Sequence, residues 1–169
     1  FMRHEVAYLG HVISENGVKP DPSKIECINN YPKPQNTRDI KSFLGLVGYY
    51  RKFIPNFSKS SQKLTALLKK DAIFKWTEEH DFAFDTLRNA LTKEPVLQYP
   101  DFKIPFNLTT DASNTAIGAI LSQGPSSKDL PIACGSRTLN KAEINYSTIE
   151  KELLAIVWAF SFSSISLWS

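Results

Sequence analysis

The spacing of apolar residues changes near residue 105 of this chain, and this change restricts the possible folds more than any other feature of the sequence. Upstream, apolar residues recur at intervals of three and four, which indicates an amphipathic helix. The clearest series is Ile40, Phe43, Leu44, Val47 and Tyr50. Downstream, the side chains of residues 106–111 alternate between two faces, which is typical of a β-strand. Separate helical and strand-forming blocks predict an α+β fold.

Turn and capping residues divide the first block into further elements. Residues 4–18 are rich in β-branched and aromatic side chains and contain an Asn16-Gly17 turn signal, so they predict a β-hairpin. Asp21 and Pro22 predict a helix start, and that helix ends before Pro32. Further helices are predicted at about 36–53, 58–68 and 78–92.

The second block predicts three strands and one helix. The strands span about 106–111, 116–122 and 132–137, with a turn at 124–127. Ser147 and Glu150 stand in capping-box register, which places the start of the helix. Its apolar stripe contains Ile149, Leu153, Ile156, Val157 and Phe160.

Length and composition exclude several classes of protein. The 169 residues suffice for one domain or two small pieces. Two cysteines do not make a disulfide scaffold, which favours an intracellular protein in either cytoplasm or nucleus. We expect no membrane partner, because no apolar run approaches the ~20 residues of a span, and no secretory signal opens the chain. The first residue, Phe1, suggests a piece of a longer protein.

The charge is distributed unevenly. Residues 19–70 hold eleven cations and three anions, an excess of +8, whereas the whole chain carries +3. A basic segment of this kind could bind the phosphates of nucleic acid. A cationic helix face that is only solvated would have the same composition. Three residues, Lys41, Gly45 and Tyr49, share one helix face, which Arg51 and Lys52 extend.

The predicted helix at about 36–53 contains a glycine, Gly45, in its interior. Gly45 costs ~1 kcal/mol relative to alanine in a helix interior, so we expect something to approach it closely. The backbone of a nucleic acid is one candidate and another helix is the other.

Acidic residues of the second block are the candidates for chemistry. Asp111 lies at the carboxyl end of a strand, where it could bind a metal or simply form an Asx turn. Glu150 and Glu152 flank the apolar stripe of the last helix, and periodicity does not choose between them or exclude that both are solvated. Small residues at Ala155 and Ala159 would let the helix approach a sheet closely. Three histidines, His4, His11 and His80, have no metal-ligand spacing.

Four segments in order resemble the Pol polyprotein of Ty3/gypsy-class LTR retrotransposons. They are Tyr8–Ser14, Ser42–Pro55, Phe106–Ser113 and Ile149–Val157, and the resemblance extends from residue 1 to about 159. It implies that residues 1–20 are the end of a reverse transcriptase palm, 21–95 a helical thumb, and 104–160 the first half of an RNase H fold, a β-β-β-α unit.

The resemblance also implies roles for individual residues. Leu9 and Gly10 fall in the primer grip of the palm, and Lys41, Gly45 and Tyr49 fall on the thumb helix that follows the minor groove of the template–primer. The partners would then be an RNA–DNA hybrid or duplex nucleic acid, together with the remainder of the Pol polyprotein.

Asp111 and Glu152, rather than Glu150, match the catalytic carboxylates that hold Mg²⁺ in the RNase H site. Two ions at such a site activate water and stabilise the leaving oxygen during phosphodiester hydrolysis. The polymerase acids would lie upstream of Phe1 and the other RNase H carboxylates downstream of Ser169. We therefore expect an incomplete site and no robust catalysis by this chain alone.

Residues 161–169 depart from the family pattern. A plausible coding string for the family's residues, read in a shifted frame, gives Ser163–Trp168, so we interpret this tail as the product of a frameshift. The leading hypothesis is a reverse transcriptase/RNase H fragment that binds nucleic acid. The alternatives are a non-catalytic, domesticated nucleic-acid-binding module and a protein-interaction module.

Overall fold

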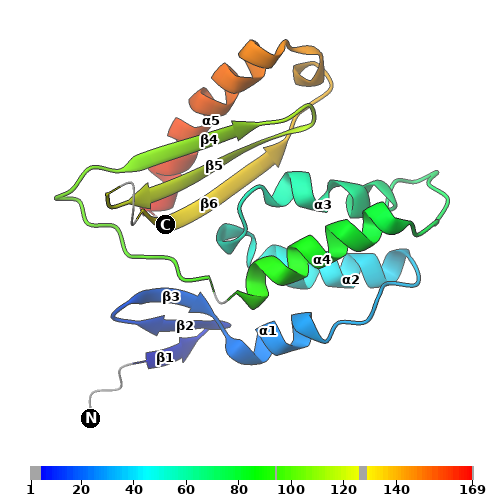
Figure 1. Ribbon diagram of the computed structural model, residues 1–169, viewed down its shortest axis with the longest axis horizontal. Coiled ribbons are helices and arrows are strands. Elements are labelled where there is room, and N and C mark those ends of the chain that lie inside the picture. Colours follow the sequence, from blue (N-terminus) through cyan, green and yellow to red (C-terminus); the bar gives the residue numbers. More distant parts are fainter. Residues whose placement is uncertain (1–4, 94, 126–128, 169) are drawn as a thin grey trace.

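The computed structural model describes residues 5–93, 95–125 and 129–168. These residues form two three-stranded antiparallel sheets and five α-helices (Figure 1). The first sheet has the order β1-β2-β3, with β1 at Glu5–Tyr8, β2 at His11–Ser14 and β3 at Gly17–Pro20. The predicted hairpin therefore gains a strand, because an additional turn precedes the one predicted at Asn16-Gly17. That later turn is formed by Glu15 and Asn16, since Gly17 begins β3 and pairs with Ser14. His4, at the start of the predicted hairpin, lies outside the described residues.

The additional turn, which comes first along the chain, is formed by Leu9 and Gly10. Both residues have positive φ, 45° and 71°, and they join the paired residues Tyr8 and His11. Positive φ at both central positions is the geometry of a type I′ turn, whose twist matches that of the flanking strands. The sequence signal was weak because leucine seldom adopts this conformation.

Four helices and a short 3₁₀ turn follow. They are α1 at Pro22–Asn29, α2 at Thr37–Tyr49, η1 at Arg51–Phe53, α3 at Phe57–Ala66 and α4 at Glu78–Thr92. The predicted stripe of α2 faces inward: Ile40, Phe43 and Val47 are fully buried. Because α1 to α4 pack around one apolar core, we call them the helical unit.

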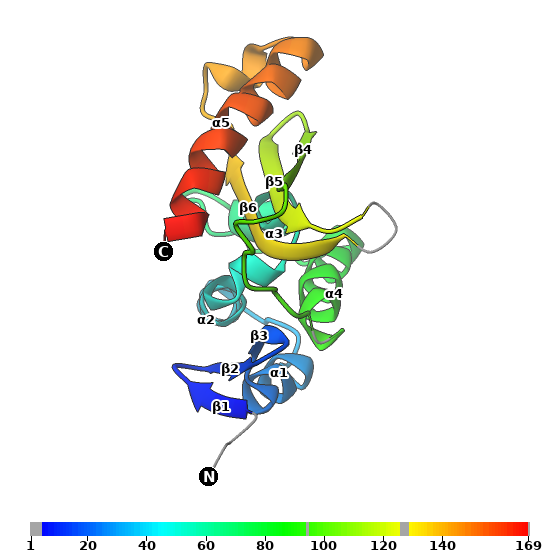
Figure 2. The ribbon, with the colours of Figure 1, turned by 90° about the vertical axis from the view of Figure 1, so that its left-hand side faces the viewer.

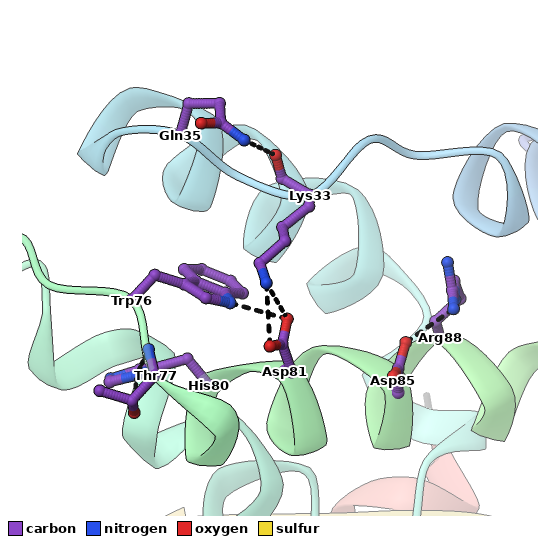
Figure 3. A network of polar contacts seen from close by, with 8 residues as sticks. All are labelled: Lys33, Gln35, Trp76, Thr77, His80, Asp81, Asp85 and Arg88. Atoms are coloured by element: carbon purple, nitrogen blue, oxygen red, sulfur yellow. Dashed lines mark hydrogen bonds and ion pairs between the residues drawn. The ribbon is translucent and has the colours of Figure 1, made fainter.

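A polar cluster fixes the α1–α2 connection to the start of α4 (Figure 3). Lys33 Nζ lies 2.7 Å from Asp81 Oδ1, and Trp76 Nε1 donates to the same oxygen at 2.8 Å. These hydrogen bonds lower the pKa of Asp81. At the helix start, Thr77 and His80 form a capping box. The exposed residues of this cluster position the connection, and the core beneath supplies the stability.

The second sheet and the last helix form a β-β-β-α unit, which we call the sheet unit. Its elements are β4 at Asn107–Ala112, β5 at Ala116–Gln123, β6 at Leu130–Thr138, the 3₁₀ turn η2 at Glu143–Asn145, and α5 at Thr148–Trp168. The strand order is β4-β5-β6. Within the turn predicted at 124–127, Ser126 and Ser127 lie outside the described residues.

Opposite faces of this sheet carry different helices (Figure 2). A Cβ at Gly135 would meet Phe162 of α5, whereas a Cβ at Gly118 would meet Asn56 beside α3. The order of elements and the two kinds of unit confirm the predicted α+β fold. None of the helices in the described residues combines the length and apolarity needed to cross a bilayer.

The face of α5 that packs on the sheet is formed mainly by small residues. Ala155 and Ala159 are fully buried, as their size predicted, and Lys151 is only 8% exposed. The large apolar residues of the predicted stripe point away from the sheet, because small side chains allow the closer helix–sheet approach. The outward residues are Ile149, Leu153, Ile156, Val157 and Phe160. The helix continues through residues 161–168 of the predicted tail.

Candidate nucleic-acid interface and carboxylate site

The Leu9-Gly10 turn is bonded to the end of α2. The Tyr49 hydroxyl donates to the Leu9 carbonyl, and the Tyr50 hydroxyl donates to the Gly10 carbonyl at 2.7 Å. Burial is the main reason that the pKa of Tyr50 rises to about 12, so the hydroxyl remains a donor even above its ordinary pKa of 10.0. Leu9 and Gly10 of the hairpin and Tyr49 of α2, all predicted to contact nucleic acid, therefore lie next to one another.

His11 supports this junction from below. Its ring lies 5.4 Å from that of Tyr49, 5.5 Å from that of Tyr50 and 5.8 Å from that of Phe53, between centroids. Its Nδ1 lies 2.9 Å from the Leu9 carbonyl oxygen. Burial lowers the pKa of His11, which favours a neutral ring at pH 7. The histidine acts as packing under the turn, in agreement with its lack of metal-ligand spacing.

The outer face of α2 is open. Lys41, Gly45 and Tyr49 are all exposed, and a Cβ placed on Gly45 would find no atom within 4 Å. Within the described chain no other helix approaches Gly45, so the glycine is not needed for packing between these helices. The exposed surface at Gly45 is therefore one that a backbone from outside the chain could approach closely.

Arg51 and Lys52 lie at the end of this face and differ in their surroundings. Arg51 Nη2 donates to the Ser136 carbonyl at 3.1 Å, so this guanidinium reaches the sheet unit. Lys52 Nζ lies 5.5 Å from the centroid of the Phe53 ring, and burial lowers the pKa of this amine. The predicted cationic surface therefore ends at Arg51, which lies at the boundary between the helical unit and the sheet unit.

Asp111 also lies at that boundary. Asn56 Nδ2 donates to Asp111 Oδ2 at 2.8 Å, and Lys59 Nζ lies 3.6 Å from the same oxygen. Asp111, Gly118 and Ser136 are cross-strand neighbours in one row. Gly118 leaves the space that Asn56 occupies, because a Cβ there would lie 2.0 Å from Asn56 Oδ1.

Ser136 completes the boundary, which we call the α3–sheet junction. Its hydroxyl accepts a hydrogen bond from the Ser58 amide at 2.9 Å. Gln62 accepts another from the Thr115 hydroxyl at 2.8 Å. No sequence pattern predicts these contacts, because the partners are more than 50 residues apart. Among the residues of this junction, Asn56 has an unusual backbone conformation, because its φ of 52° lies in the left-handed region.

The two glutamates of α5 have separate positions. Glu150 accepts a hydrogen bond from the Ser147 amide at 2.7 Å, and the Ser147 hydroxyl accepts from the Glu150 amide at 3.3 Å. This capping box lowers the pKa of Glu150. Glu152 is exposed on the helix. The structure therefore assigns Glu150 to helix capping and leaves Glu152 available to solvent.

These acids do not by themselves fit a magnesium site. Across residues 5–93, 95–125 and 129–168, no three His, Cys, Asp or Glu side chains come together as possible metal ligands. Asp111 Oδ2 already accepts a hydrogen bond from Asn56 and pairs with Lys59, so a dication would compete with the Lys59 ammonium for this carboxylate.

Residues 76–169 match the family described as "RNase H-like domain found in reverse transcriptase". The chain belongs to this family. The match begins before α4 and includes the whole sheet unit, so the α+β arrangement and the family assignment agree.

Relatives in transposons are similar over nearly the whole chain. The Pol polyprotein from transposon 297 of Drosophila melanogaster is 49% identical over 94% of the chain and 15% of its own length. The one from transposon gypsy of the same species is 46% identical over 94% of the chain and 16% of its length. The Schizosaccharomyces pombe Tf2-3 polyprotein is 39% identical over 93% and 12%. The predicted resemblance is confirmed, and the chain spans about a sixth of these relatives or less.

Solved structures are similar to the same extent. A foamy viral protease-reverse transcriptase dRH in complex with double-stranded DNA has a TM-score of 0.80 and 25% identity, covering 99% of this chain and 30% of that one. The foamy viral protease-reverse transcriptase in complex with an RNA/DNA hybrid has a TM-score of 0.76 and 27% identity, covering 98% and 22%. The likeness therefore includes both the helical unit and the sheet unit.

Proposed function

We propose that this chain is a fragment of a retrotransposon reverse transcriptase/RNase H that binds an RNA–DNA hybrid or DNA duplex along the outer face of α2. The observation that supports this most is the Tyr49 hydrogen bond to Leu9, which joins the turn to that face. Two structural relatives are complexes with double-stranded DNA or an RNA/DNA hybrid, which agrees with the proposal.

The physical basis is charge and close approach. Lys41 and Lys52 would neutralise phosphates and release counterions, which gives affinity without sequence preference. The open surface at Gly45 allows a sugar–phosphate backbone to approach the helix closely. Tyr49 holds the turn against this face, so that both contact the same duplex. The rest of the Pol polyprotein would supply the remainder of the binding channel.

Binding to a fluorescent RNA–DNA hybrid at increasing salt tests this proposal. We expect Lys41→Gln to weaken binding and to reduce the slope of log affinity against log salt by about 0.9. Lys141→Gln, an exposed lysine of the sheet unit, serves as the control and keeps the slope. Salt-independent binding, or equal effects of the two substitutions, contradicts the proposal.

The RNase H site in this proposal is incomplete. The RNase H-like family is generally magnesium-dependent, and bound Mg²⁺ supplies activation of the attacking water. Asp111 and Glu152 would need further ligands, and Asp111 would first have to leave Lys59. We expect no cleavage of a hybrid by this chain alone.

A non-catalytic, domesticated nucleic-acid-binding module is the second candidate, and the contacts of Asp111 with Asn56 and Lys59 favour it. Hybrid cleavage that requires Mg²⁺ and disappears in Asp111→Asn would contradict both the incomplete site and this second candidate.

A further inference from the structure

The ring of His11 has one nitrogen with a partner and one without. Its Nδ1 lies 2.9 Å from the Leu9 carbonyl oxygen, whereas its Nε2 is buried and has no hydrogen-bond partner among the described residues. A carbonyl oxygen can only accept, so the neutral ring carries its proton on Nδ1 and a lone pair on Nε2. On the sheet, its cross-strand neighbours are Tyr8 and Pro20, and neither brings a carboxylate. A second proton would therefore sit at Nε2 without an acceptor.

Aromatic rings surround His11 on the side of α2 and η1. They belong to Tyr49, Tyr50 and Phe53, whose centroids all lie within 6 Å of that of the imidazole. The hydroxyls of Tyr49 and Tyr50 do not serve Nε2, because they donate to the two carbonyls of the turn. These contacts suit an uncharged ring, since a buried charge without a hydrogen-bond partner is costly.

The charged groups beside the ring also disfavour a second proton. Burial lowers the pKa of His11, the hydrogen bond to the Leu9 carbonyl offsets part of this effect, and the Lys52 ammonium of η1 adds to the lowering. Asp21, which follows β3, does not compensate, because its Oδ1 already accepts from the amide and the hydroxyl of Ser23. The folded junction therefore favours the neutral imidazole.

We propose that His11 is a positioning residue for duplex binding, whose neutral ring holds the Leu9-Gly10 turn against the end of α2 and whose protonation releases the turn. The path from ring to turn is short, because the Leu9 carbonyl that accepts from Nδ1 also accepts from the Tyr49 hydroxyl. A ring that moves to hydrate a proton at Nε2 gives up the first bond and disturbs the packing beneath the second. This inference rests on the function proposed above, in which the turn and α2 contact one duplex.

The direction of the pH dependence separates this role from a direct contact with nucleic acid. A histidine that touched phosphates would gain a positive charge in acid and strengthen binding. Protonation of His11 should instead weaken binding, because the charged ring does not fit the junction. The two roles thus predict opposite signs over the same range of pH.

Affinity for a fluorescent RNA–DNA hybrid, measured at constant ionic strength, tests this role. We expect the parent chain to bind at least about threefold more weakly at pH 5.5 than at pH 7.5, the range in which histidine titrates. His11→Phe keeps an aromatic ring without titrating nitrogens and should show no such loss. His80→Gln, at the start of α4, is the matched histidine control and should keep the loss.

NMR of the free chain follows the same event without nucleic acid. A Cβ placed on Gly10 would lie 3.3 Å from a ring carbon of Tyr49, so the α protons of Gly10 should give nuclear Overhauser contacts to that ring. We expect these contacts to weaken as the His11 ring gains its proton, with a midpoint below the ordinary histidine value of 6.5.

The two measurements separate this inference from the proposed function. If the parent chain does not bind the hybrid at neutral pH, the proposed function fails, and the NMR titration alone decides whether His11 positions the turn. Contacts between Gly10 and Tyr49 that persist after His11 is protonated overturn the inference. Binding that acid strengthens or leaves unchanged, or a loss in His11→Phe equal to that of the parent chain, also overturns it.

Discussion

The helical unit and the sheet unit differ in how completely each buries its apolar residues. One cluster of fourteen buried apolar residues joins the helices and includes Leu97, whereas the corresponding cluster of the sheet unit has three, Ile117, Leu139 and Ala155. The outward face of α5 adds Leu153 at 56% and Val157 at 67% exposure. The difference shows that the helical unit holds its own core, while much of the apolar surface of α5 contributes nothing to the folding of the described chain.

The largest effect that separates the units is expected at Phe43. This ring is fully buried and lies 4.4 Å from that of Phe84, between centroids. We expect Phe43→Ala to lower the free energy of unfolding by about 3–5 kcal/mol, because it leaves a cavity. Leu153→Ala, on the exposed face of α5, is the control and should change it by no more than about 0.5 kcal/mol. Urea unfolding measures both, and equal losses would show that the α5 face is covered.

The next effect is expected where the units meet. Gly118→Ala forces a methyl group into Asn56, so we expect a loss of about 1–3 kcal/mol and a looser α3–sheet junction. Asn56→Gly removes the obstructing amide and suits the left-handed backbone at φ 52°. The double variant should therefore recover stability relative to Gly118→Ala. If the double variant is no more stable than Gly118→Ala, Asn56 does not occupy the space beside Gly118 in solution.

These two positions also show what the sequence could predict. The core of α2 was predictable because its residues follow a local period of three and four, and a helix with one apolar face has one way to bury it. The junction was not predictable, because Asn56 and Asp111 are 55 residues apart and neither residue type indicates its partner.

The last helix shows a different limit. Its sequence offers two faces, one with large apolar residues and one with Ala155 and Ala159, and periodicity gives no preference between them. The structure buries the small residues, and the helix approaches the sheet. The predicted carboxylates, Asp111 and Glu152, keep their predicted places on β4 and α5, but the contacts of Asp111 depend on tertiary structure alone.

A smaller effect tests the core of the sheet unit through pH. Burial raises the pKa of Cys134 to about 11 from its ordinary value of 9.0. Between these values the unfolded thiol loses its proton and the folded thiol keeps it, so stability falls as pH rises. We expect this thiol to account for roughly 2 kcal/mol of the loss by pH 11, a part that Cys134→Ala removes. The raised pKa of Tyr50 leaves its own alkaline loss in the variant.

Cys27, exposed on α1 of the helical unit, is the control for this measurement. Cys27→Ala should retain the alkaline loss of stability, as measured by urea unfolding at each pH. A pH profile that is unchanged in Cys134→Ala would mean that the sheet unit does not exclude water from this thiol.

The central claim, that an open helix face in the helical unit grips a duplex, is tested most directly at Gly45. A Cβ at this position meets no atom within 4 Å, and leucine is a better helix former than glycine, so we expect Gly45→Leu to raise the free energy of unfolding by about 0.8 kcal/mol. The added side chain should nevertheless keep a nucleic-acid backbone from the helix and weaken binding of an RNA–DNA hybrid about tenfold or more. A more stable variant that binds the hybrid as tightly as the parent chain would contradict the account.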